Sequence, residues 1–211
     1  MLTKILDRHM KEFIFTFLII LSYTTVYAQE RLPTYPHIEI ETTEGNFKLE
    51  LNSKAAPITV KNFLNLVDSG FYDGTVFHRI IPGFMAQGGG FTPGFKKKFI
   101  RDTIINESGN GLSNVRGTIA MARTNNPHSA STQFFINVVD NNGQTSSSVN
   151  LDPIKNNKQS RWGYAVFGFV FDGMEVVDTI VNKDSKLNGP GGAPAPIIPI
   201  VIKKITRISY K

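Results

Sequence analysis

The chain has 211 residues, a formal net charge of +6 and no cysteine. The absence of cysteine excludes disulfide bonds, thiolate nucleophiles and cysteine-ligated zinc. The basic residues cluster only at 96–98 and 203–204, and neither cluster alternates with exposed aromatic residues as a nucleic-acid surface would, so we expect no nucleic-acid partner.

Residues 1–28 have the pattern of a secretory signal peptide. A basic residue precedes the apolar run 13–21, and small residues precede a cut after Ala28. The run is too short to span a bilayer, which takes about 20 apolar residues. We expect translation to start at Met10 and the cleaved protein to be exported without membrane insertion, into the periplasm of a two-membrane bacterium and otherwise by secretion. An uncleaved anchor is the alternative.

The chain after the leader begins with a hairpin and a helix. Two runs of alternating polarity, 38–42 and 46–51, surround a glycine-containing turn and predict a β-hairpin. Pro57 then opens a pattern with apolar residues at three- and four-residue spacing, and Ser69 and Gly70 end it. We expect this helix to pack on the hairpin.

The rest of the chain is mainly β. Short β-rich runs, separated by Gly, Asn and Pro clusters, occur at 75–80, 84–88, 117–122, 134–139 and 165–170. A second helical pattern at 174–181 and a closing strand at 200–208 follow. The segments 141–161 and 188–199 are poor in core-forming residues and are predicted to be loops.

Most conventional catalytic sets are missing from the sequence. The four histidines are scattered without metal-ligand spacing, so we expect no metal site. The glycines at 88–90 are not followed by the Lys-Ser/Thr of a phosphate loop, and no Gly-x-Ser-x-Gly nucleophile motif occurs.

Arg79 is the residue that stands out in this sequence. It lies in a strand-like stretch near Phe77, Phe84 and Met85, with Gln87 further on. A charged group among apolar ones is costly unless it is paired. A salt bridge to an acidic residue would explain Arg79 structurally, whereas a catalytic role would explain it functionally.

The run FHRIIPGFMAQGG at 77–89 resembles the signature of the cyclophilins. Further blocks resemble later parts of that family, so the resemblance covers about 38–208. These blocks are GTIAMAR at 117–123, STQFFIN at 131–137, YAVFG at 164–168 and DGMEVV at 172–177. The resemblance divides the chain into a signal peptide (1–28), an N-terminal extension (29–37) and a cyclophilin-like domain (38–211).

This resemblance implies a fold, an activity and a set of site residues. The fold would be a closed eight-stranded antiparallel β-barrel capped by two α-helices, and the activity peptidyl-prolyl cis-trans isomerisation without a cofactor. Arg79 would be the catalytic residue. The substrate-binding residues would be Phe84, Met85, Gln87, Ala122, Arg123, Phe135, Leu151 and Tyr164.

Two positions depart from the family pattern. Tyr164 stands where many members have a pocket histidine, and Asn150 stands where eukaryotic members have a tryptophan. The only tryptophan, Trp162, is interpreted as a packing residue, because tryptophan side chains are usually largely buried.

The expected partners are proline-containing segments of unfolded or partly folded proteins, and the protein is expected to be monomeric. Slow X-Pro isomerisation can limit folding, so an exported isomerase would assist the folding of other exported proteins. The alternative is a non-catalytic module that holds proline-containing peptides in the same groove, as a chaperone or scaffold.

Overall fold

The computed structural model describes residues 34–144, 149–155 and 160–209. The predicted leader and residues 29–33 of the extension lie outside this part, so the signal-peptide cut stays a prediction. Among the described residues, no helix is both long enough and apolar enough to cross a membrane.

The first two strands form the predicted hairpin. β1 (His37–Thr42) pairs antiparallel with β2 (Gly45–Leu51), and Thr42 lies opposite Gly45 at the turn. Buried and more exposed residues alternate along both strands, as expected when one face of a β-hairpin enters the core.

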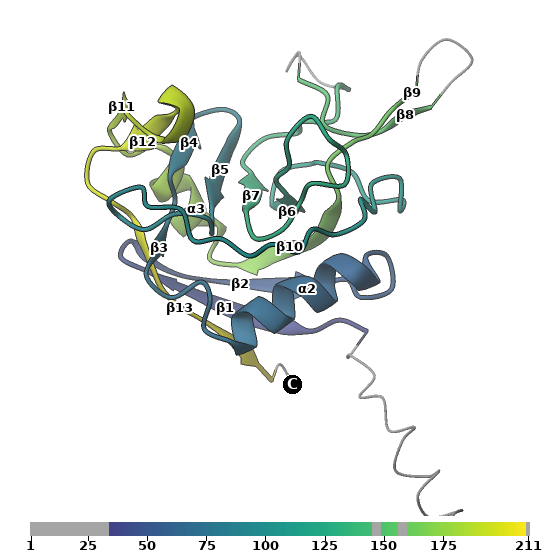
Figure 1. The fold of residues 1–211 in the computed structure, drawn as a ribbon, viewed down its shortest axis with the longest axis horizontal. Helices are drawn as coiled ribbons and strands as arrows, with labels where there is room; N and C mark the ends of the chain where they lie inside the picture. The colour runs from purple at the N-terminus through teal and green to yellow at the C-terminus, as the bar shows by residue number, and fades with distance from the viewer. Residues whose placement is uncertain (1–33, 145–148, 156–159, 210–211) are drawn as a thin grey trace, which may run out of the picture. The chain divides into compact units, whose positions relative to one another are not determined.

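The hairpin belongs to one antiparallel sheet with the order β3-β13-β1-β2-β10-β6-β7-β5-β4 (Figure 1). The other strands are β3 (Thr75–Val76), β4 (Arg79–Ile81), β5 (Met85–Gly88), β6 (Thr118–Met121), β7 (Phe134–Asn137), β10 (Val166–Asp172) and β13 (Val201–Ile208). Except for the run at 75–80, the predicted strands are confirmed to within two residues at either end.

The structure corrects the closed eight-stranded barrel. The sheet has nine strands, and its order is open because β3 and β4 form its two ends. The strand expected at 75–80 divides because the backbone changes partner: Phe77 donates its N–H to the carbonyl of Ile200, whereas His78 donates to that of Gln87. The fold is a curled antiparallel half-barrel (Figure 1).

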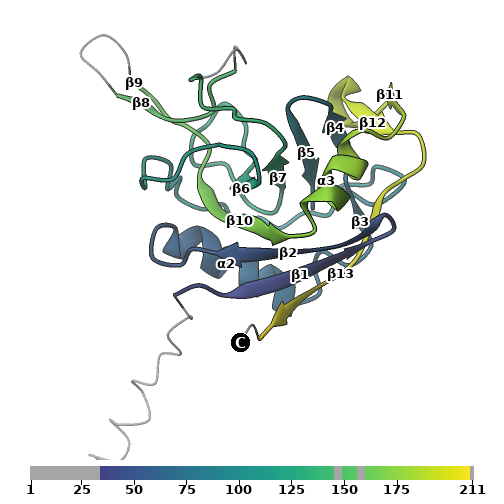
Figure 2. The same cartoon turned by 180° about the vertical axis from the view of Figure 1, so that it is seen from behind.

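Both predicted helices are present. α2 (Pro57–Asp68) contacts β13, and α3 (Met174–Val181) contacts β2, β4 and β5. α2 lies nearer the viewer in Figure 1 and α3 in Figure 2. The buried side of α2 includes the predicted residues Val60, Phe63, Leu64 and Val67.

The two predicted loops contain short regular elements. β8 (Ile154–Lys155) pairs with β9 (Ser160–Arg161) within 141–161, and the pair projects away from the sheet (Figure 1). The second segment carries η1 (Pro190–Gly192) and β12 (Pro194–Pro196), which pairs with β11 (Ser185–Leu187). The loop prediction was therefore wrong for these stretches, because local backbone pairing needs no apolar pattern.

Aromatic rings fill the core beneath α2. The ring of Phe63 lies 5.1 Å from Tyr72, 5.7 Å from Phe134 and 5.2 Å from Phe167, measured between centroids. Gly89 passes close to two of these rings: it has a φ of 80°, and a Cβ there would lie 2.8 Å from both Tyr72 and Phe134. Glycine is needed at this position for close packing.

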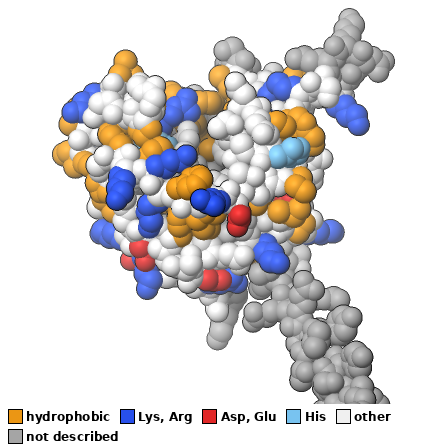
Figure 3. Space-filling model, viewed as in Figure 1, with side chains coloured by type: hydrophobic (Ala, Val, Ile, Leu, Met, Phe, Trp, Pro, Cys, Tyr) orange, Lys and Arg blue, Asp and Glu red, His pale blue; other side chains and the backbone are white. Residues whose placement is uncertain are grey.

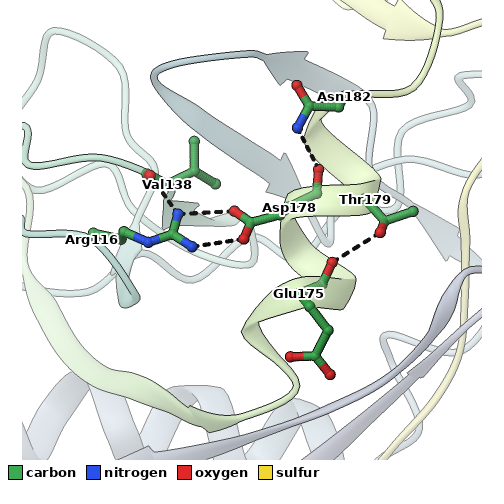
Figure 4. Close-up of polar contacts among 6 residues, drawn as sticks. All are labelled: Arg116, Val138, Glu175, Asp178, Thr179 and Asn182. Atoms are coloured by element: carbon green, nitrogen blue, oxygen red, sulfur yellow. Dashed lines mark hydrogen bonds and ion pairs between the residues drawn. The ribbon is translucent and has the colours of Figure 1, made fainter.

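A guanidinium clamp ties α3 to the sheet (Figure 4). Arg116 donates to both carboxylate oxygens of Asp178 on α3, at 2.9 and 2.7 Å, and to the carbonyl of Val138 at 2.7 Å. The pair raises the pKa of Arg116 chiefly through the hydrogen bonds to Asp178, against an opposing effect of partial burial. The clamp thus fixes α3 beside the end of β7.

One face carries lysine and arginine side chains beside apolar ones (Figure 3). Phe99 is 62% exposed, and the Lys97 ammonium lies 5.2 Å from its ring centroid. An exposed aromatic residue thus follows the cluster at 96–98 but does not alternate with its lysines. The absence of a nucleic-acid partner stays a prediction.

Candidate active site

One cavity of about 170 Å³ lies beside the β6-β7-β5-β4 part of the sheet. Its walls come from these strands, from the turns next to them and from the segment between β7 and β10. The lining residues are Arg79, Phe84, Met85, Gln87, Ala122, Arg123, Phe135, Leu151 and Tyr164. The structure therefore brings together all nine residues that the sequence analysis assigned to the site.

Cross-strand pairing explains why several of these side chains meet. Arg79 on β4 lies opposite Gln87 on β5, and Gln87 lies opposite Phe135 on β7. Residues opposite each other in antiparallel strands project from the same face of the sheet. Met85 precedes Gln87 by two residues and so projects from this face as well. The register alone places a cation, an amide and two apolar groups side by side.

The floor of the cavity is apolar. Met85 and Phe135 are 1% and 3% exposed, and they pack with the buried residues Ala120 and Val166. The ring of Tyr164 stands over this floor, 5.6 Å from the Phe135 ring at an interplanar angle of 79°. Such edge-to-face contacts stabilise the relative position of two rings.

Phe84 is held by its backbone in the turn between β4 and β5. Its N–H donates to the carbonyl of Ile81 at 3.0 Å. Its carbonyl accepts from the Val138 N–H at 3.1 Å and from Asn141 Nδ2 at 3.0 Å. Gly83 adopts a φ of 69°, which favours glycine at this position of the turn.

The guanidinium of Arg79 lies at the cavity, and only its Nη1 has hydrogen-bond partners among the described residues. Nη1 donates to Gln87 Oε1 at 3.2 Å, and the guanidinium carbon lies 5.8 Å from the Phe84 ring centroid. Partial burial lowers the pKa of Arg79, with an opposing effect of Tyr164, but arginine stays charged at neutral pH. No carboxylate within the described part of the chain forms an ion pair with Arg79, so the structural salt bridge is not its explanation there.

Gln133 supports the site, and the sequence analysis did not assign it. Its Oε1 accepts from Gln87 Nε2 at 2.9 Å, which leaves Gln87 Oε1 facing Arg79. The carbonyl of Gln133 also accepts from the N–H of Ala122, another lining residue. Its position directly before the phenylalanine pair of β7 was the available signal.

Arg123 fixes the opposite wall. Its Nε donates to Gly163 O at 3.1 Å and its Nη2 to Trp162 O at 2.8 Å. The guanidinium carbon lies 4.5 Å from the Tyr164 ring centroid. The side chain of Arg123 therefore holds the segment that carries Tyr164.

Trp162 and the pair Asn150 and Leu151 lie near this wall. Trp162 was interpreted as a packing residue, but it is 47% exposed, with its ring 5.2 Å from that of His128. Its neighbour Gly163 has no room for a side chain, because a Cβ there would overlap the backbone nitrogen of Pro153. Leu151 lines the cavity, whereas Asn150 is not among the lining residues.

Comparisons with known proteins show the family of this chain. The family profile described as "Cyclophilin type peptidyl-prolyl cis-trans isomerase/CLD" matches residues 37–207. The chain is 45% identical to peptidyl-prolyl cis-trans isomerase A of Dickeya dadantii, over 87% of this chain and 90% of that protein. It is 51% identical to peptidyl-prolyl cis-trans isomerase B of Escherichia coli, over 68% of this chain and 82% of that protein.

A solved structure is also similar. It is a cyclophilin type peptidyl-prolyl cis-trans isomerase of Cryptosporidium parvum, crystallised in the presence of the dipeptide Ala-Pro. The TM-score is 0.60 at 29% identity, covering 82% of this chain and 99% of the other. The chain therefore belongs to the cyclophilin-type peptidyl-prolyl cis-trans isomerases, a family of enzymes.

Proposed function

We propose that this protein accelerates rotation about X-Pro peptide bonds, with Arg79 as the catalytic residue. The observation that carries the proposal is a charged guanidinium, without a carboxylate partner among the described residues, at the edge of an apolar cavity. The lining of the cavity is mostly apolar with a few polar groups, the composition that is typical of small-ligand sites.

The reaction needs stabilisation of a twisted amide. Resonance gives the peptide C–N bond a rotation barrier of about 18–20 kcal/mol. Rotation breaks this resonance, so the proline nitrogen becomes pyramidal and basic. A hydrogen bond from Arg79 to that nitrogen is stronger in the twisted state than in the planar ground state, and this difference lowers the barrier.

The other lining residues hold the substrate during this rotation. In the proposal, Phe84, Met85 and Phe135 accept the proline ring, and the preceding residue turns about the C–N bond. Gln87, held by Gln133, orients Arg79. The apolar floor of the cavity strengthens the hydrogen bond of Arg79 because it lowers the local dielectric constant. The mechanism has no covalent step and needs no cofactor.

The remaining assigned residues form the walls. Ala122 and the backbone of Arg123 border the groove, and Leu151 and Tyr164 also line it. The Ala-Pro dipeptide present with the related Cryptosporidium protein supports a proline-containing peptide as the ligand here.

The direct test is Arg79→Ala in an assay of cis-to-trans conversion of an X-Pro peptide. We expect kcat/KM to fall by about 10²–10³-fold, the usual effect of removing one charge-stabilising donor from a transition state. Circular dichroism should show an unchanged fold, because Arg79 forms no ion pair among the described residues. A wild-type protein that binds the peptide without accelerating its conversion would instead be the non-catalytic binding module.

We further propose that the protein is exported and assists the folding of other exported proteins. The support is the sequence of the first 28 residues, with a basic start, an apolar run and small residues before Ala28. N-terminal sequencing of the protein recovered from outside the cytoplasm should begin at Gln29. Recovery of the uncleaved chain in the membrane fraction would show a retained anchor.

A further inference from the structure

Asn141 lies fully buried at the start of a segment whose sequence predicts a loop. Its side-chain Nδ2 donates two hydrogen bonds, to the Phe84 carbonyl at 3.0 Å and to Asn137 Oδ1 at 2.8 Å. Its Oδ1 is buried without a hydrogen-bond partner among the described residues, so the two bonds that Nδ2 donates are the ones that offset the cost of burying this amide. This amide is used to hold the backbone of a residue that lines the cavity.

The backbone of Asn141 reaches the opposite wall. Its carbonyl accepts from the Leu151 N–H at 2.7 Å, and the Leu151 carbonyl accepts from the Tyr164 N–H at 2.9 Å. A continuous path of hydrogen bonds therefore runs from Phe84 through Asn141 to Leu151 and Tyr164. Three lining residues depend on this one buried residue.

A second set of contacts keeps the Leu151 end of the path in place. The carboxylate of Asp152 accepts from Asn114 twice, from N–H at 2.7 Å and from Nδ2 at 2.9 Å, and also from the hydroxyl of Ser113. Asn114 Nδ2 lies 3.2 Å from the Tyr164 carbonyl as well. Because three hydrogen bonds converge on the Asp152 side chain, we expect a shift at Asn141 to be transmitted mainly to Phe84.

From these contacts we infer that Asn141 is a positioning residue for the proline pocket, which it serves by setting the distance between the Phe84 wall and the Leu151 wall. The inference rests on the proposed function, because it names the support of that same site. The chain Arg79-Gln87-Gln133 does not include Asn141. Loss of the Asn141 side chain should therefore weaken binding of the peptide, whereas stabilisation of the transition state by Arg79 should be unaffected.

Two substitutions at Asn141 distinguish the effect of its side-chain hydrogen bonds from the effect of its side-chain shape. Asn141→Asp keeps the shape, but its carboxylate can donate neither bond and faces the oxygens of Phe84 and Asn137. Asn141→Ala removes both donors without adding charge. For either variant we expect KM for an X-Pro peptide to rise about tenfold, whereas kcat changes less than about threefold, because a misplaced wall costs orientation of the ligand.

A stability-matched control distinguishes positioning from general loss of structure. Val60→Ala removes buried side-chain atoms from α2, which packs on β13 and contributes no lining residue. At a temperature where all variants are folded, Val60→Ala should keep KM within about twofold of wild type. Equal KM values for the wild type and both Asn141 variants would overturn the inference, and so would a tenfold increase in Val60→Ala.

A measurement on the wild-type protein covers the case in which the variants do not fold. Addition of an Ala-Pro-containing peptide should shift the side-chain amide resonances of Asn141 together with the backbone resonances of Phe84 and Leu151. Unchanged Asn141 resonances at saturating peptide would overturn the inference. If wild-type protein binds the peptide without turnover, the proposed isomerase function fails, whereas peptide dissociation constants of the variants still test Asn141.

Discussion

The Arg79 side chain is both charged and planar, and a substitution by lysine can test which of the two properties the reaction needs. One Nη1–H donates to Gln87, and the guanidinium carbon lies 5.8 Å from the Phe84 ring centroid at the cavity. A lysine at this position would keep the charge but would replace the planar fork by a single flexible ammonium group.

We therefore expect Arg79→Lys to lose at least about tenfold in kcat/KM, because the donor is no longer aimed at the proline nitrogen. The expected residual rate lies above that of Arg79→Ala, since some charge stabilisation persists. Measurement of all three proteins with one peptide checks the order. Wild-type activity in Arg79→Lys would show that charge alone is sufficient.

At the residue scale, the sequence was enough to predict the residues that line the cavity. It was not enough to predict Gln133 and Asn141, which hold lining residues in place. The run at 77–89 places Arg79, Met85 and Gln87 on adjacent strands, so local sequence and strand register bring them together. Gln133 and Asn141 act through contacts with residues 46 and 57 positions away. Gln133 directly precedes the phenylalanine pair of β7, whereas Asn141 belongs to no apolar pattern, and nothing in its local sequence distinguishes a buried amide from a surface one.

At the scale of elements, the N-terminus of α2 has an unusual cap. Ala56 offers no side-chain acceptor, and Pro57 has no N–H. The carboxylate of Glu107, from a distant segment, accepts from the N–H groups of Ile58 at 3.0 Å and Thr59 at 2.8 Å. The sequence predicted the start of the helix from Pro57 but gave no signal for this long-range cap.

We expect Glu107→Gln to lower the free energy of unfolding by about 1 kcal/mol, because a neutral amide has one acceptor oxygen and interacts less with the helix dipole. Urea unfolding followed by circular dichroism measures the change. Glu175→Gln is the matched control: Glu175 lies in the first turn of α3 and caps no N–H among the described contacts. Its loss should stay below about 0.5 kcal/mol, and equal losses would contradict the capping role of Glu107.

Element prediction succeeded where the apolar period was long enough. The helices and the longer strands have repeated apolar positions at the spacing that each element requires, and these were confirmed. The pairs β8-β9 and β11-β12 are too short to show a period. The division of the strand at 75–80 depends on which neighbour each N–H finds, and only the assembled sheet determines that.

At the scale of the whole molecule, His78 lies between the two end strands of the sheet, where the backbone passes from one partner to the other. It is 3% exposed. Burial lowers the pKa of His78 to about 4, the charge of Arg79 acts in the same direction, and hydrogen bonding to Val76 and Gln133 opposes the shift. The folded protein therefore holds this imidazole neutral, whereas the unfolded chain protonates it near pH 6.5.

This difference predicts how stability depends on pH. Between pH 6.5 and about 4 the unfolded state binds the proton and the folded state does not, so the free energy of unfolding falls as the pH falls through this window. The shift from 6.5 to about 4 corresponds to a contribution of about 3 kcal/mol, fully lost below pH 4. Urea unfolding at pH 7, 5.5 and 4.5 should show a steeper loss for wild type than for His78→Gln, which cannot titrate. Parallel pH profiles for the two proteins would mean that carboxylates alone cause the acid sensitivity.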